Sequence, residues 1–201
     1  IDHAACSVQG LFDEGHIRDY LPDPDQDALL RTAVACHSAY RLPKDLDERT
    51  RMFCQILRDA DKIDILRVNV EVPLEAIYNT TDAELRQSEV TPEVLEAFEE
   101  EHAVLRSLKK TPVDNVVGHM ALVFELVYPI SAQLAEEQHY LDQLMNFVSD
   151  NETTQRQFAL LRAHMQEYLK RRRAEISAVE VSGEGKGRTG DAADRRERHD
   201  G

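Results

Sequence analysis

Leu57-Arg58-Asp59-Ala60-Asp61-Lys62-Ile63-Asp64 is a charged stretch set between apolar segments. Apolar residues recur at spacings of three and four on both sides of it, which predicts one long helix over residues 47–70 that Pro73 closes. Residues three or four apart lie on one side of a helix, so the charges of this stretch are spread around the helix axis.

Asp61 is the carboxylate that this arrangement singles out. It shares a helix face with Arg58, Asp64 and apolar neighbours, whereas Asp59 points well away. A carboxylate on an apolar face needs a cation beside it. Two interpretations supply one: an ion pair between Arg58 and Asp61 at a spacing of three, or a bound metal ion.

The same apolar spacing continues over most of the chain and predicts an all-α protein. We find no convincing run of strand-like alternation. Helices are expected over residues 2–14, 26–40, 47–70, 92–102, 114–133, 136–148 and 152–173. Pro129 is expected to bend or divide the fifth of these near its end, and residues 74–91 to be irregular or to hold one short helix.

Composition narrows the functional classes. The 201 residues carry a net charge of -14, which argues against nucleic acid as the main partner, because phosphates are bound by clustered Lys and Arg. The longest apolar run, around residues 120–130, is broken by Glu125 and is too short to span a membrane, so no membrane partner is expected. Three cysteines without a Cys-x-x-Cys spacing predict reduced thiols and a cytoplasmic location.

The chain is expected to form one helical domain over residues 1–175, followed by a disordered tail over 176–201. The last twenty residues hold five of the eight glycines, balanced charges and almost no apolar residues, so they cannot bury enough surface to fold. A nucleic-acid arm is the alternative for the arginines of this tail, but interleaved acids and the absence of aromatics disfavour it.

The sequence contains no glycine-rich phosphate loop, no Gly-x-Ser-x-Gly elbow, no His-Glu-x-x-His and no calcium loop. Histidines therefore become the candidates for chemistry beside the acidic stretch. His3 follows Asp2 at the start of the chain, and His37 lies between Cys36 and Ser38. His119 lies among apolar residues, which favours a hydrogen-bonded core histidine, while the Glu-rich surroundings of His102 and His139 favour solvated faces.

Residues 57–64, preceded by the helix that bears His37 and by the Asp-His-Ala opening at His3, resemble the later part of an HD-domain metal-dependent phosphohydrolase. The resemblance covers residues 1–68, and residues 69–175 would be a helical extension. It implies an HD-like helical bundle in which Asp61, within Ala-Asp-Lys, is the family's final metal-binding Asp. His3 and His37 match the two extra histidines of members that bind two metals.

The family's first His and its His-Asp pair have no match upstream of Asp61, because the only His-Asp is His199-Asp200. We therefore expect a chain truncated at its N-terminus, in which the missing ligands weaken or abolish activity as supplied and the uncovered apolar surface drives homo-oligomerisation. The remnant of His3, His37 and Asp61 is expected to bind a divalent metal: Mn, Fe, Mg or Zn.

The resemblance implies metal-assisted hydrolysis of a small phosphorylated substrate, a phosphate ester or a nucleotide. Arg58 and Lys62 are the candidates for contacting the substrate phosphate. Asp64 is the candidate for supporting the metal ligands without binding the metal itself. No catalytic acid or base is identified. The alternative is a non-catalytic helical interaction protein in which the Asp-rich turn is an ion-pair network, and in which His37 is an ordinary core histidine.

Overall fold

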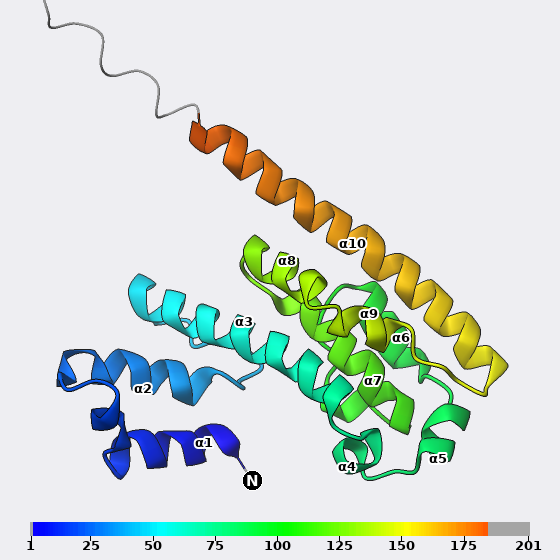
Figure 1. Ribbon diagram of the computed structural model, residues 1–201, viewed down its shortest axis with the longest axis horizontal. Helices are drawn as coiled ribbons and strands as arrows, with labels where there is room; N and C mark the ends of the chain where they lie inside the picture. The colour runs from blue at the N-terminus through cyan, green and yellow to red at the C-terminus, as the bar shows by residue number, and fades with distance from the viewer. Residues whose placement is uncertain (1, 185–201) are drawn as a thin grey trace, which may run out of the picture.

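The computed structural model describes residues 2–184, and every regular element within that range is helical (Figure 1). The all-α prediction is therefore confirmed. The α-helices are α1 (His3–Val8), α2 (Asp27–Cys36), α3 (Glu48–Glu71), α4 (Leu74–Tyr78), α5 (Asp82–Gln87), α6 (Pro92–Glu99), α7 (Pro112–Met120), α8 (Pro129–Glu137), α9 (Tyr140–Met145) and α10 (Glu152–Glu184).

The helix α3 connects the two ends of the molecule. Its N-terminal half packs against α2, which in turn holds α1, and its C-terminal half packs against α7, α8 and α9 (Figure 1). The Asp47 carboxylate accepts a hydrogen bond from the Thr50 N–H at 3.0 Å and so begins the helix, and Val72 and Pro73 end it. The long helix predicted over residues 47–70 is confirmed to within one residue at each end.

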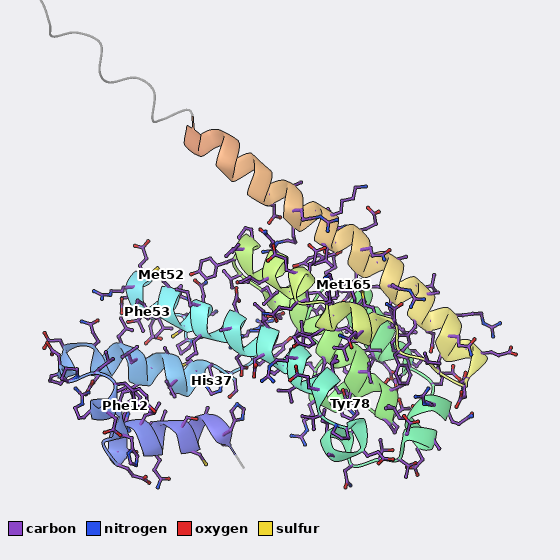
Figure 2. The ribbon with its side chains drawn as sticks, in the orientation of Figure 1. Phe12, His37, Met52, Phe53, Tyr78 and Met165 are labelled. Atoms are coloured by element: carbon purple, nitrogen blue, oxygen red, sulfur yellow. The ribbon has the colours of Figure 1, made fainter. Side chains whose placement is uncertain are left out.

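The hydrophobic core lies on the C-terminal side of α3. Its fully buried side chains come from α3, α5, α6, α7, α9 and α10 and include Leu66, Leu85, Phe98, Met120, Leu141, Phe158 and Met165. Met165 is labelled within this region in Figure 2. Of the residues described before α3, only Ala4 and Ala33 are buried apolar side chains. The α1–α2 unit thus contributes fewer fully buried apolar side chains than the rest of the described structure.

The segment expected to be one helix over 114–133 is instead three pieces. After α7 the chain forms a 3-10 turn over Ala121–Glu125, becomes extended, and restarts as α8 at Pro129. Pro129 lacks an N–H and disfavours helical geometry in the residue before it, which is why the break is longer than a bend. The expected irregular segment 74–91 holds two short helices, α4 and α5, the second with a capping box between Thr81 and Glu84.

The remaining predicted bounds shift as well. In place of one helix over 136–148, α8 continues to Glu137 and a separate α9 follows His139, whose φ is 60°. The helix expected to stop at residue 173 continues to Glu184, so residues 176–184 of the predicted tail are helical. The rest of that tail lies outside the described residues. No helix in the described part of the chain is long and apolar enough to cross a membrane.

The break before α8 is held from two sides. On one side Asp59 of α3, which is 2% exposed, accepts hydrogen bonds from the N–H of Val127 at 3.0 and 3.1 Å and of Tyr128 at 3.0 Å. On the other side the Arg172 guanidinium of α10 donates to the carbonyls of Leu126 at 2.9 Å and Val127 at 3.3 Å. The unpaired backbone groups of this loop are thereby satisfied by two oppositely charged side chains.

We expect Asp59→Ala to lower the free energy of unfolding by about 2 to 4 kcal/mol, because it leaves two backbone N–H groups without an acceptor in a buried place. Asp61→Ala is the matched control on the same helix, and its effect is expected to stay below about 1 kcal/mol, since Asp61 accepts no hydrogen bond within residues 2–184. Urea unfolding of both variants measures this. Equal effects of the two substitutions would contradict the capping role of Asp59.

Candidate metal centre

His3 is placed by the start of α1. The Asp2 carboxylate caps this helix by accepting hydrogen bonds from the N–H of Ala4 at 3.0 Å and of Ala5 at 3.2 Å. His3 is therefore the first helical residue, and its side chain is exposed. Its position depends on the cap and on the packing of α1 against α2.

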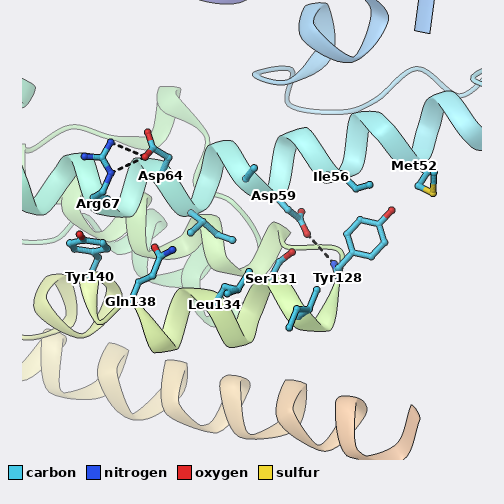
Figure 3. A pocket seen from close by; sticks show the side chains of 13 residues that line it. Met52, Ile56, Asp59, Asp64, Arg67, Tyr128, Ser131, Leu134, Gln138 and Tyr140 are labelled. Atoms are coloured by element: carbon cyan, nitrogen blue, oxygen red, sulfur yellow. Dashed lines mark hydrogen bonds and ion pairs between the residues drawn. The ribbon is translucent and has the colours of Figure 1, made fainter. Parts of the chain in front are cut away.

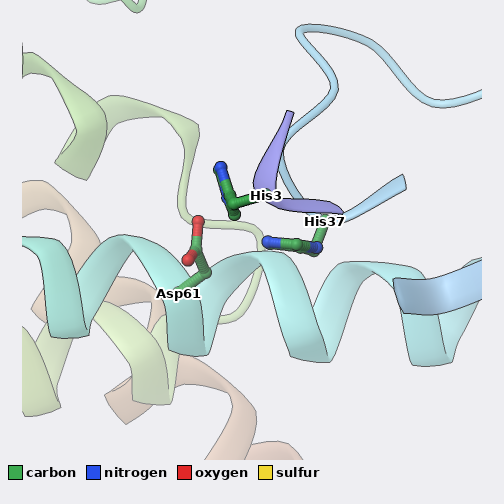
Figure 4. A group of neighbouring side chains, drawn as sticks. All are labelled: His3, His37 and Asp61. Atoms are coloured by element: carbon green, nitrogen blue, oxygen red, sulfur yellow. The ribbon is translucent and has the colours of Figure 1, made fainter. Parts of the chain in front are cut away.

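His37 lies at the C-terminal end of α2 (Figure 2), and its ring is next to Asp61 of α3 (Figure 4). Its ring atom Nδ1 lies 2.7 Å from the Val34 carbonyl oxygen, an acceptor that the end of the helix leaves free. A carbonyl can only accept, so Nδ1 carries the proton and donates. Nε2 is then the nitrogen with the free lone pair, and it is the atom that a metal ion would use.

Asp61 completes the group from the middle of α3. The ligand atoms of His3, His37 and Asp61 all lie within 4.8 Å of one another, and the two imidazole ring centres are 4.8 Å apart at an interplanar angle of 67° (Figure 4). Two donors at about 2.1 Å from one ion are at most about 4.2 Å apart, so small side-chain rotations bring the three atoms around one cation. The structure thus brings together the three residues that the sequence predicted as metal ligands.

The donor set fits a divalent metal ion. Two imidazole nitrogens and one carboxylate are the ligand types of zinc and non-haem iron sites, and three protein ligands leave coordination positions for water and substrate. The predicted ion pair between Arg58 and Asp61 is not formed, because the Arg58 guanidinium donates to backbone carbonyls, and among the described residues no Lys or Arg side chain forms an ion pair with Asp61, although the neighbouring Lys62 charge acts on it. Asp61 therefore has a free carboxylate, as a metal ligand requires.

The residues predicted to contact substrate point elsewhere. The Arg58 guanidinium donates to backbone carbonyls at the end of α2, and the Lys62 ammonium lies buried, 3.5 Å from the Arg58 carbonyl oxygen. Burial, followed by the nearby Arg58 charge, lowers the pKa of Lys62. These contacts argue against either side chain as a free phosphate ligand.

Asp64, predicted to support the site, is exposed and forms an ion pair with Arg67 at 2.8 Å. It is not in the His3–His37–Asp61 group.

His119 belongs to a different, structural cluster. The Asn69 side-chain NH₂ donates to the Ile65 carbonyl at 2.8 Å, and its side-chain oxygen accepts a hydrogen bond from the Tyr78 hydroxyl at 2.7 Å. Because the Tyr78 proton is used in this way, Nδ1–H of His119 donates to the Tyr78 oxygen at 2.9 Å. Desolvation, with the nearby Lys109 charge, lowers the pKa of His119 to about 4. The predicted role as a hydrogen-bonded core or boundary histidine is consistent with these contacts.

His102 and His139 lie on solvated faces, as expected. Each pairs with a neighbouring carboxylate, His102 with Glu100 at 2.8 Å and His139 with Asp142 at 3.2 Å. Neither belongs to a group of three metal-ligating side chains among the residues that the structure describes.

An apolar groove of about 860 Å³ runs between α3 and α8 (Figure 3). Its exposed apolar side chains are Met52, Ile56, Ile130 and Leu134, and polar groups gather at the end formed by Asp64, Arg67, Gln138 and Tyr140. Ile56 and Asp59 face this groove, and Asp61, two residues further along, is turned by roughly 200° from Asp59 around the helix. The groove and the metal cluster therefore lie on different faces of α3.

The groove was not predicted from the sequence. Ile56 is one of the apolar residues whose spacing predicted the helix over residues 47–70, yet it is 50% exposed. The available signal was the division of residues 114–133 at Pro129, which creates the second wall of the groove by starting α8 there.

Comparison with known proteins adds no relative: no family model, no curated protein and no solved structure matches this chain.

The lowered pKa of His119 predicts a specific loss of stability in acid. The unfolded chain takes up a proton near pH 6.5 and the folded chain only near pH 4, so this contribution to stability is complete above about pH 6.5 and is lost as the pH falls toward 4. Between pH 7.5 and 5.0 we expect a loss of up to about 2 kcal/mol from this residue.

His119→Gln removes the titrating group and keeps an amide that can donate to Tyr78. Urea unfolding at the two pH values should show a smaller loss of stability in this variant than in the unaltered chain. Identical pH dependence of the two proteins would show that His119 is not protected from protonation.

Proposed function

We propose that this chain carries a divalent-metal site of the HD-domain phosphohydrolase type and acts on a small phosphorylated substrate, either a phosphate ester or a nucleotide. The observation that supports this is the convergence of His3, His37 and Asp61, three residues from three separate helices, on one point. The Ala-Asp-Lys setting of Asp61 supplies the link to the family.

Metal chemistry at this site would lower the pKa of a bound water and offset negative charge on phosphoryl oxygens. The chain supplies the rest of the arrangement. His37 presents Nε2 because its Nδ1 proton is committed to Val34, and Asp61 presents an unpaired carboxylate from a rigid helix. Two imidazoles favour iron, zinc or manganese over magnesium, which prefers oxygen ligands.

The proposed setting is cytoplasmic. Cys6, Cys36 and Cys54 are all free thiols, which agrees with a reducing compartment. Neither nucleic acid nor a membrane is proposed as a partner, given the net charge of -14 and the composition of the helices.

A second function, that of a helical interaction protein, is supported by the apolar groove between α3 and α8. Its walls expose four large apolar side chains on neighbouring helices, a surface typical of protein contact sites. The groove and the metal cluster are on different faces of α3, so the two functions are compatible in one chain.

The metal site is tested by titrating the metal-free protein with Mn²⁺ and counting bound ions by electron paramagnetic resonance. We expect one tight ion per chain, with affinity reduced at least about 100-fold in His37→Ala and in Asp61→Ala, because each removes one of three protein ligands. His139→Ala is the matched control, since His139 is exposed and pairs only with Asp142. Negligible binding to all four proteins would overturn the proposed site.

The reaction is tested separately by phosphate release from a panel of nucleotides and sugar phosphates in the presence of Mn²⁺. We expect weak release, because part of the family's ligand set has no match in this chain, and this release should depend on the metal and fall to background in Asp61→Ala. Metal binding without phosphate release from any compound would support the metal site and reject hydrolysis of these substrates. The interaction function would then be the remaining proposal.

A further inference from the structure

We infer that Arg58 is a positioning residue for the metal ligand His37, an inference that rests on the proposed metal site. Arg58 belongs to α3, whereas His37 ends α2, and the two residues are brought together only by the packing of these helices. The family resemblance implied that Arg58 contacts the substrate phosphate, whereas its hydrogen bonds in the structure favour this different role.

Arg58 is 8% exposed, and its guanidinium forms hydrogen bonds with the backbone around His37. One terminal nitrogen donates to the carbonyls of Cys36, at 3.3 Å, and Ala39, and the other donates to the carbonyl of Tyr40 at 3.4 Å. The three acceptors flank His37 on both sides in the chain. The guanidinium thus fixes the turn in which His37 lies.

A cation is the suitable group at this place. The last carbonyls of a helix have no partner within the helix and form the negative end of its dipole. The turn after α2 has no glycine to provide the usual left-handed cap, since its sequence is Cys36-His37-Ser38-Ala39-Tyr40. The planar, many-donor guanidinium of Arg58 replaces that cap from outside the helix.

The ring and the backbone of His37 are fixed by different partners. The Val34 carbonyl sets which ring nitrogen is protonated, and the Arg58 guanidinium holds the carbonyls on either side of the residue. Arg58 also lies one helical turn before Asp61 on α3. One rigid helix therefore carries both a ligand, Asp61, and the group that positions the ligand opposite it, so the separation of His37 and Asp61 is set by α3.

The experiment compares Arg58→Met, which keeps the apolar stem but not the donors, with Arg58→Lys, which keeps one charged donor group. Arg172→Met is the matched control, because Arg172 is also largely buried and donates to two loop carbonyls, but at Leu126 and Val127. Mn²⁺ affinity and urea stability are measured for all three variants and for the unaltered chain.

We expect Arg58→Met to weaken Mn²⁺ binding roughly 10- to 100-fold, the usual cost of losing a group that orients a ligand, and Arg58→Lys to recover part of that loss. Arg172→Met should lower stability comparably while changing affinity less than about twofold. Equal Mn²⁺ affinities of the Arg58→Met and Arg172→Met proteins would overturn the inference, and if Arg58→Met does not fold, an unchanged affinity in Arg58→Lys would do so.

Nitrogen NMR of the His37 ring in the metal-free protein separates this inference from the proposed function. The unaltered chain at pH 8 should show Nδ1 protonated, and Arg58→Met should show a mixture of the two tautomers. Absence of Mn²⁺ binding in the unaltered chain with this NMR result intact would reject the proposed function and keep Arg58 as the residue that orders His37. An unchanged ring spectrum in Arg58→Met would reject the positioning role.

Discussion

One turn of α3 contacts three other parts of the chain through its charged side chains, and the rest of the structure depends on these contacts. Arg58 reaches the carbonyl end of α2, Asp59 reaches the N–H groups before α8, and Asp61 remains free toward His3 and His37. Successive residues of a helix are about 100° apart, so Arg58 and Asp61, three residues apart, share the face toward α1 and α2, while Asp59 points away from them toward the segment before α8. A helix in the middle of the fold can in this way anchor both flanks while it presents a ligand.

The buried charged side chains of this turn bind backbone groups and do not form an ion-pair network. Arg58 and Asp59 are both buried, and each hydrogen-bonds to backbone groups at a helix end rather than to the other side chain. A charged side chain beside the helix end of opposite partial charge is stabilised by several aligned peptide dipoles. This explains how acidic and basic side chains can be buried among apolar residues without forming ion pairs with each other.

The parts of the molecule that could be predicted from sequence are those set by local periodicity. The bounds of α3 follow from apolar spacing, whereas His3, His37 and Asp61 were predicted as one group only from the resemblance of residues 1–68 to a known family. The roles of Arg58 and Asp59 could not be predicted, because their partners are backbone atoms, which every residue possesses and which leave no mark in the sequence. The break before α8 was underestimated for the same reason, since two distant side chains, Asp59 and Arg172, stabilise it.

The small number of fully buried apolar side chains in the N-terminal unit, α1 and α2, gives the metal cluster a further consequence. Among the described residues before α3, only Ala4 and Ala33 bury apolar side chains, yet His3 and His37 come from this unit and Asp61 from the helix against which it packs. An ion held by all three would close a loop of nearly sixty residues, as a cross-link does. Occupancy of the site and protection of the first two helices from proteases would then be one linked equilibrium, governed by the free concentration of the metal.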